Sequence, residues 1–176
     1  CIRDSCYIGP HAVVYGNARV TGNAIVNDYA KVYGHAQIYG SAKVYGDAQV
    51  YDNAQVYCDA KVSGNAKVYG NARVTNNAMI HDNAQVYDNA IVRNNAEVFN
   101  DAEIFGNGDV YESIKIYDNC AVTRKPKACF GFDYNVFITD HHITIGCVSF
   151  PPSKIETTGK RMVRMMTVSY THLTLP

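Results

Sequence analysis

The sequence lacks the features that mark membrane proteins and nucleic-acid-binding proteins. No apolar run approaches the roughly 20 residues of a membrane-spanning helix, and no signal peptide is visible. The 16 basic and 16 acidic side chains cancel to a formal net charge of zero, so no overall basic field attracts a nucleic acid or an anionic membrane. We therefore expect neither nucleic acid nor membrane as a partner.

Sequence motifs for binding zinc or phosphate are also missing. The six cysteines include no Cys-x-x-Cys pair, which argues against a zinc ribbon. Cys6 and Cys120 replace alanine in a repeated pattern, and Cys58 lies at an expected turn. We interpret these cysteines as free thiols, which favours a reducing compartment, the cytoplasm. No glycine-rich phosphate loop occurs, so we expect no bound cofactor.

What the chain does contain is one hexapeptide, repeated about twenty times. Every sixth residue from Ile8 to Val122 is Ile or Val, and the position two residues earlier is alanine without interruption from Ala12 to Ala102. The unit reads aliphatic, Tyr or Thr, Gly/Asp/Asn, Asn/Asp, Ala, variable. Self-similarity at a fixed period predicts a repeat architecture.

The order of residues within the unit predicts a triangular coil. The variable, aliphatic and Tyr positions form a short strand whose aliphatic side chain points inward. Gly and Asn then turn the chain, because both tolerate left-handed backbone. Three units close one coil of eighteen residues, and stacked coils pair their strands in parallel. We therefore predict that residues 1–122 form an all-β parallel solenoid of about six to seven coils, in which Val50 and Val68 are stacked neighbours.

The repeat resembles that of the bacterial hexapeptide-repeat proteins. The stretch KVYGDAQVYDNAQVY is typical of the pattern, and the similarity spans residues 3–122. The resemblance implies a left-handed parallel β-helix, an exception to the usual right-handed crossover. It also implies two activities known in the family, acyl transfer from acyl-CoA and zinc-dependent carbonic anhydrase activity. The departure from the family is Tyr or Thr where Gly or Asp is frequent, at a position that points outward.

The repeat stops after Val122, and residues 123–150 predict a C-terminal cap. Two short strands, 136–139 and 143–145, favour a β-hairpin that covers the last coil. The Ile-x-Ile-Gly-Cys stretch from Ile143 is similar to the end region of uncharacterised bacterial and prophage hexapeptide-repeat proteins.

The two ends of the chain carry separate expectations. Residues 151–176 have no period, and their ending, VSYTHLTLP, resembles a spurious translated sequence, so we expect an irregular, non-native tail. Ile2 is in phase with the inward positions, which favours a solenoid that begins upstream of Cys1.

The resemblance implies a histidine as general base, placed in a cleft between the prisms of a trimer. Many such enzymes extrude a loop that closes the cleft, and none interrupts residues 3–122. His11 and His35 occupy turn positions and His81 an outward strand position. If the chain is an acyltransferase, His35 is the first candidate and His81 the second. Asp82 adjoins His81, but we expect it to face along the turn, so no acid partner is obvious.

A zinc site like that of the carbonic anhydrases needs three converging imidazoles. His35 and His81 are 46 positions apart, so they do not stack in an eighteen-residue coil. The pair His141–His142, with Asp140 or Cys147, is a second conceivable cluster. Adjacent strand residues point to opposite faces, which argues against it. We expect no metal.

Sorting the outward positions by eighteen places one aromatic ring per coil on a single face. The residues, which we call the Tyr ladder, are Tyr15, Tyr33, Tyr51, Tyr69, Tyr87 and Phe105. One interpretation is that stacked rings simply stabilise neighbouring coils. The other is a contact surface, because Tyr is large, stiff and amphipathic. Such a face would pack in a homo-oligomer such as a trimer, bind a glycan, or bind a partner protein.

Charge at the variable position changes sign along the chain. The basic residues come first and the acidic ones last: Arg19, Lys31, Lys43, Lys61, Lys67 and Arg73, then Glu97, Glu103 and Asp109. One interpretation is an ordinary solvated surface. The other is that prisms associate antiparallel or end to end, which brings unlike charges together.

The sequence therefore favours a non-catalytic scaffold or binding module that acts through the Tyr ladder. The unbroken register and the absent loop support this hypothesis. The alternative is an acyl-CoA-dependent O- or N-acyltransferase, which is supported by the family resemblance alone.

Overall fold

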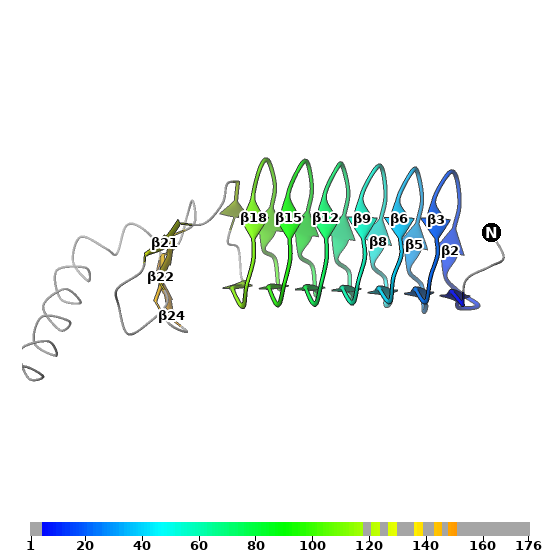
Figure 1. Cartoon of the computed structure of the whole chain (residues 1–176), viewed down its shortest axis with the longest axis horizontal. Coiled ribbons are helices and arrows are strands. Elements are labelled where there is room, and N and C mark those ends of the chain that lie inside the picture. Colours follow the sequence, from blue (N-terminus) through cyan, green and yellow to red (C-terminus); the bar gives the residue numbers. More distant parts are fainter. Residues whose placement is uncertain are drawn as a thin grey trace, which may run out of the picture. The chain divides into compact units, whose positions relative to one another are not determined.

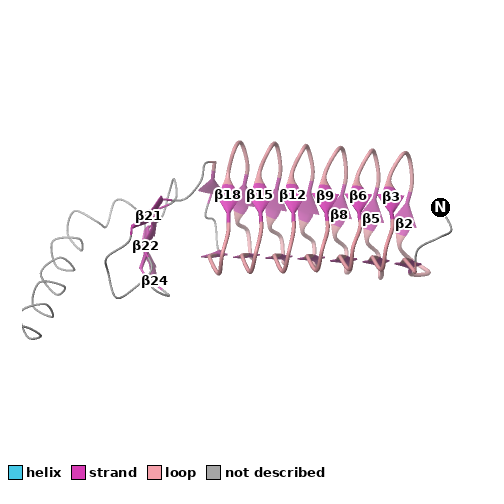
Figure 2. Cartoon of the chain, in the orientation of Figure 1, coloured by secondary structure: helices cyan, strands magenta, loops and turns pink. Residues whose placement is uncertain are grey.

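The computed structural model describes residues 5–117 and 121–123, together with the backbone of four later strands. The chain divides into two compact units, Cys1–Pro126 and Lys127–Pro176. The first holds the hexapeptides as a regular stack of coils (Figure 1). Within the described residues, each unit is built from strands and turns (Figure 2).

Each hexapeptide of the first unit contributes one two-residue strand to one of three parallel sheets. Sheet A contains β1 (Tyr7–Ile8), β4 (Ile25–Val26), β7 (Lys43–Val44), β10 (Lys61–Val62), β13 (Met79–Ile80), β16 (Glu97–Val98) and β19 (Lys115–Ile116). Sheet B contains β2 (Val13–Val14), β5 (Lys31–Val32), β8 (Gln49–Val50), β11 (Lys67–Val68), β14 (Gln85–Val86), β17 (Glu103–Ile104) and β20 (Ala121–Val122). Sheet C contains β3 (Arg19–Val20), β6 (Gln37–Ile38), β9 (Gln55–Val56), β12 (Arg73–Val74), β15 (Ile91–Val92) and β18 (Asp109–Val110).

The strands pair in the predicted register of eighteen residues. Val50 lies opposite Val68, and the Tyr51 amide donates to the Val68 carbonyl at 3.0 Å. The parallel solenoid of about six coils and three sheets is therefore confirmed. Left-handedness, which the family resemblance implies, stays a prediction.

The interior is the predicted column of Val, Ile and Ala. From Ala24 to Ile104 every inward aliphatic and every alanine is fully buried. Burial of this apolar surface and the ladder of backbone hydrogen bonds between coils are the two main sources of stability. Thr75, which is 7% exposed, is the one buried polar residue among those described.

The first of the two turn positions carries the left-handed backbone. Its φ angles lie between 55° and 71°, and its occupants are mainly Gly, Asn and Asp. At Gly64 a β-carbon would lie 2.8 Å from the backbone nitrogen of Asp82, so the close approach of two coils also favours glycine there. Cys58 and Glu112 adopt the same conformation with φ of 59°, which is unfavourable for such side chains.

Aspartates at this turn position also bond the next coil. The Asp28 carboxylate accepts from the Gly46 amide at 3.0 Å, and the Asp88 carboxylate accepts from the Gly106 amide at 3.1 Å. These turn amides have no partner in the hydrogen-bond ladder of the strands, and the carboxylates provide one. Asp is therefore tolerated at the turn both for its conformation and for this hydrogen bond.

The second unit contains an antiparallel sheet of β21 (Lys127–Cys129), β22 (Val136–Ile138), β23 (Ile143–Ile145) and β24 (Val148–Phe150), in that order. The two strands expected from the sequence pair as β22 and β23, with Val136 opposite Ile145. The outer strands were not anticipated. The capping role of this hairpin stays a prediction, and the expected tail at 151–176 lies outside the described residues.

Candidate functional site

The Tyr ladder is a continuous stack of six rings. It follows the strands of sheet B, and consecutive rings are separated by 4.8–5.1 Å between centroids with interplanar angles of 2–8°. The spacing equals that of neighbouring strands, so the backbone sets it. Because each inner ring is covered on both faces, the ladder presents ring edges and hydroxyls to solvent, not ring faces.

Stacking leaves the inner rings half-buried, whereas Tyr15 at the end of the stack is 51% exposed. Burial, followed by the charges of neighbouring groups, raises the pKa of Tyr51 to about 12. Burial also raises the pKa of Tyr87 to about 12. The next cause is the Glu103 carboxylate, which accepts a hydrogen bond from the Tyr87 hydroxyl at 3.2 Å. These phenols are therefore neutral donors at physiological pH.

The equivalent positions beside sheets A and C form shorter stacks. Beside sheet C, Tyr39 stacks on Tyr57 at 4.8 Å, and the Arg93 guanidinium lies 5.0 Å from the ring centre of Tyr111. Between them stands buried Thr75, whose hydroxyl lies 3.6 Å from the Cys58 sulfur and 3.4 Å from an Asn76 oxygen.

The stack beside sheet A begins at His81. The His81 ring stacks on Phe99 at 5.2 Å, and Phe99 stacks on Tyr117 at 5.3 Å. The three-ring stack depends on the same eighteen-residue register as the Tyr ladder.

One junction between coils carries three polar contacts, one on each face. His81 Nε2 lies 3.1 Å from a Glu97 oxygen on sheet A. The Tyr87 hydroxyl donates to Glu103 on sheet B. Arg93 donates two hydrogen bonds of 2.9 Å to Asp109 on sheet C. We call these pairs the polar belt. Each joins residues sixteen positions apart, because the outward side chain leans toward the strand of the next coil.

His81 has an acid partner, contrary to the expectation from sequence. The Asp82 carboxylate lies 3.1 Å from His81 Nδ1 because the left-handed turn at Asp82 returns its side chain toward the ring. Both imidazole nitrogens are thus engaged by carboxylates. Glu97 was not predicted as a partner, because it lies sixteen positions from His81 and the eighteen-residue register does not align the two.

The Glu97 carboxylate is the centre of this network. It also bonds the Lys115 ammonium, and only 17% of its side chain is exposed. The hydrogen bond from Lys115, and then that from His81, lower the pKa of Glu97 below its ordinary value despite partial burial. A histidine held between Asp82 and Glu97 is poorly suited to accept a proton from a substrate.

The other candidate histidines have simpler surroundings. The His35 side chain is exposed, and no acid partner contacts it within the described residues. His11 stacks on Tyr29 at 5.2 Å. Neither histidine is therefore held in a cleft of this chain by a carboxylate.

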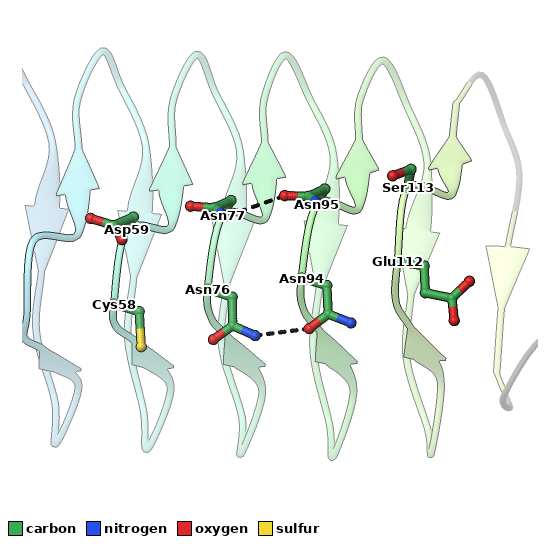
Figure 3. Close-up of a pocket in the computed structure, with 8 residues that line it drawn as sticks. All are labelled: Cys58, Asp59, Asn76, Asn77, Asn94, Asn95, Glu112 and Ser113. Carbon is green, nitrogen blue, oxygen red and sulfur yellow. Dashed lines mark hydrogen bonds between the residues drawn. The ribbon is translucent and has the colours of Figure 1, made fainter.

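An open polar groove of about 590 Å³ runs along the corner that follows sheet C. Figure 3 shows two rows of turn residues lining it: Cys58, Asn76, Asn94 and Glu112 in one row, and Asp59, Asn77, Asn95 and Ser113 in the other. Asn76 donates to Asn94 at 2.8 Å and Asn77 to Asn95 at 3.2 Å. Because these amides bond one another along the axis, part of the groove's hydrogen-bonding capacity is already used.

The described residues also bear on metal binding, thiol chemistry and membrane insertion. No group of three or more His, Cys, Asp or Glu in the described part of the chain is arranged to hold a metal ion. Within that part, Cys6 and Cys58 are free thiols. No helix among the described residues is long and apolar enough to cross a membrane. The conceivable cluster around His141–His142 lies outside them.

Comparison with known proteins identifies the repeat. Three segments, residues 12–28, 66–82 and 84–98, match a family model described as the YdcK β-solenoid repeat. All three lie within the coils, so over these segments the chain is similar to that family, and its three parallel sheets make it a β-solenoid repeat protein. No curated protein matches the chain at a significant level.

Proposed function

We propose that this protein is a non-catalytic β-solenoid scaffold that binds a partner through the Tyr ladder. The observation that carries the proposal is the unbroken stack of six rings on one face. The coils from β1 to β18 follow one another without an inserted loop, so the ring edges form a straight row on a rigid support.

The form of the ladder favours a protein partner over a glycan. A sugar ring stacks on an exposed aromatic face, and the four inner tyrosines have both faces covered. What the ladder offers instead is a row of hydroxyl donors and ring edges that repeats at strand spacing. A second solenoid has the same repeat, so a second copy of this chain is the partner that matches it.

Charge on the ladder face favours an antiparallel arrangement of the two copies. Lys31 lies near the start of the ladder, next to Tyr33, and Glu103 lies near its end, next to Phe105. An antiparallel arrangement can bring Lys31 of one copy toward Glu103 of the other. A parallel trimer, the form implied by the family resemblance, would place like charges together.

The proposal is tested by measuring mass in solution by analytical ultracentrifugation. We expect an oligomer that the double substitution Tyr51→Ser and Tyr69→Ser converts to a monomer. The matched control, Tyr39→Ser with Tyr57→Ser, removes two tyrosines from sheet C and should leave the mass unchanged. A monomeric wild type, or equal masses for both variants, would show that the ladder only supports its own coils.

Salt separates the electrostatic part of the proposal from the aromatic part. Light scattering at low and high ionic strength should show a weaker oligomer at high salt, because the facing charges are screened. A mass that does not depend on salt would count against the antiparallel arrangement, while leaving the ladder as the contact surface.

The acyltransferase alternative has one structural feature in its favour, the contact between Asp82 and His81 Nδ1. A carboxylate at this nitrogen orients catalytic imidazoles elsewhere. Against it, Glu97 engages the second nitrogen. Calorimetric titration with acetyl-CoA decides between the two functions: we expect no heat of binding, and micromolar affinity would overturn the non-catalytic proposal.

A further inference from the structure

The column of outward residues beside sheet A is interrupted by a single small side chain. In consecutive coils the column reads Tyr45, Ser63, His81. His81 stacks on Phe99 with one face of its ring, at an interplanar angle of 4°, so its other face points toward Ser63. Tyr45 stacks on no other ring within the described coils. Two aromatic rings therefore flank a position that has none.

The gap has the width of one aromatic ring. Tyr45 and His81 are two coils apart, so about 10 Å separates them along the stack. A ring inserted midway would lie about 5 Å from each neighbour. Rings in the Tyr ladder already stack at 4.8–5.1 Å. An inserted ring would thus stack at the distance that this fold imposes on its own side chains.

The gap is open to solvent. Ser63 is partly exposed, and Tyr45 is 38% exposed, more than the inner rings of the ladder. Beside sheet C, Thr75 interrupts the column in the same way but is only 7% exposed, and its hydroxyl is engaged by Cys58 and Asn76. The two interruptions therefore differ in exposure, and the one at Ser63 is the more open to solvent.

The charges next to the gap are positive on one side. Lys43 and Lys61 are exposed neighbours on β7 and β10, and neither forms an ion pair within the described residues. The sixteen-residue relation of the polar belt places Lys61 beside Tyr45 and Met79 beside the gap at Ser63. Two unpaired ammonium groups side by side attract an anion, and a thioether contacts aromatic rings favourably.

The far wall of the gap is held in place before any ligand arrives. Asp82 and Glu97 bond the two nitrogens of His81, and Phe99 supports its back face. A fixed ring loses little conformational entropy when a ligand stacks on it. From this arrangement we propose that the gap at Ser63 is a binding site for a small planar aromatic ring that bears a carboxylate.

The site is on a different face from the Tyr ladder, so its test does not depend on the proposed function. The probe is indole-3-acetate, followed by NMR on the Met79 methyl and the His81 ring protons. We expect saturable ring-current shifts at both residues. Cyclohexylacetate, which has the same charge and no aromatic ring, should produce none. If the two probes behave alike, or if no saturable shift appears, the proposal is wrong.

Substitutions at the floor of the gap make the test specific. Ser63→Tyr fills the gap and should weaken binding by at least about fivefold, the value of one stacking interaction. Ser63→Ala leaves the gap open, and its affinity should be within about twofold of wild type, since losing a hydroxyl at a partly exposed site has a small energetic effect. Thr21→Tyr adds a ring beside sheet C and is the matched control with unchanged affinity. Wild-type affinity in Ser63→Tyr would overturn the site.

The charge requirement is tested separately with Lys61→Gln. An exposed ion pair contributes about 0.2–1 kcal/mol, so the affinity for indole-3-acetate should fall by about 1.4- to fivefold. The affinity for neutral indole should not change. If both probes weaken equally, Lys61 shapes the site, and the preference for a carboxylate is wrong.

Discussion

The faces of sheets B and A are built from the same hexapeptide and differ in what they expose. Beside sheet B, six rings stack without a break and hide their faces from solvent. Beside sheet A, the column is broken at Ser63, and the exposed ring of Tyr45 and one face of His81 border the gap. The backbone is the same in both, so one outward residue per coil decides whether a face is a continuous edge or a slot.

Interrupting the Tyr ladder should have the largest effect on stability. Tyr51→Ser with Tyr69→Ser removes three ring pairs, each worth about 0.5–1.5 kcal/mol beyond area burial. We expect the free energy of unfolding in urea to fall by about 2–4 kcal/mol. Tyr39→Ser with Tyr57→Ser removes one pair and should cost about 1 kcal/mol. Equal losses in the two variants would show that the continuity of the stack has no energetic value.

The polar belt gives the second largest effect. Glu97→Gln deprives His81 and Lys115 of their shared carboxylate at a mostly buried position, and should cost about 2 kcal/mol at neutral pH. The control is Asp59→Asn, a turn carboxylate at the groove, which should change the free energy of unfolding by less than about 0.5 kcal/mol.

The same carboxylate predicts a loss of stability in acid. The pKa of Glu97 is lower in the fold than its ordinary value of 4.5, so its contribution is complete above pH 4.5 and is lost as pH falls through the lower folded pKa. Urea unfolding at a series of pH values should show that wild type loses more stability than Glu97→Gln over this window. Parallel curves would contradict the role assigned to Glu97.

In alkali the ladder itself should weaken. The pKa of both Tyr51 and Tyr87 is raised from 10.0 to about 12, so the fold prefers their neutral forms. Their contribution is complete below pH 10 and is lost as pH rises toward 12. Tyrosinate absorbance should therefore titrate at higher pH in the folded protein than in urea, and Tyr51→Phe should remove part of that late component. Identical titrations in the folded and urea-unfolded protein would contradict the raised pKa of the ladder tyrosines.

The period of six residues was sufficient to predict the coil, the register and the column to which each outward residue belongs. It did not reveal the partner of an outward residue such as Tyr87, because the lean of the side chain toward the next coil makes the contact at sixteen positions, not eighteen. It also did not show that Asp82 turns back to His81, since this depends on the left-handed φ of one residue. Nor did it separate Ser63 from Thr75, whose exposure is set by neighbours on other strands and turns.

The smallest expected effect is also the one that makes the two faces alike. Ser63→Tyr would join Tyr45 to the stack of His81, Phe99 and Tyr117, adding two ring contacts at an open position. We expect a gain of about 1 kcal/mol in the free energy of unfolding. Thr75→Tyr makes the same change at a closed position, where the larger side chain must displace buried neighbours at a cost of about 1–3 kcal/mol. Opposite signs for these two substitutions in urea unfolding would establish that the gap beside sheet A is vacant and ring-sized, whereas a loss in both would mean that the column at Ser63 is already filled by its surroundings.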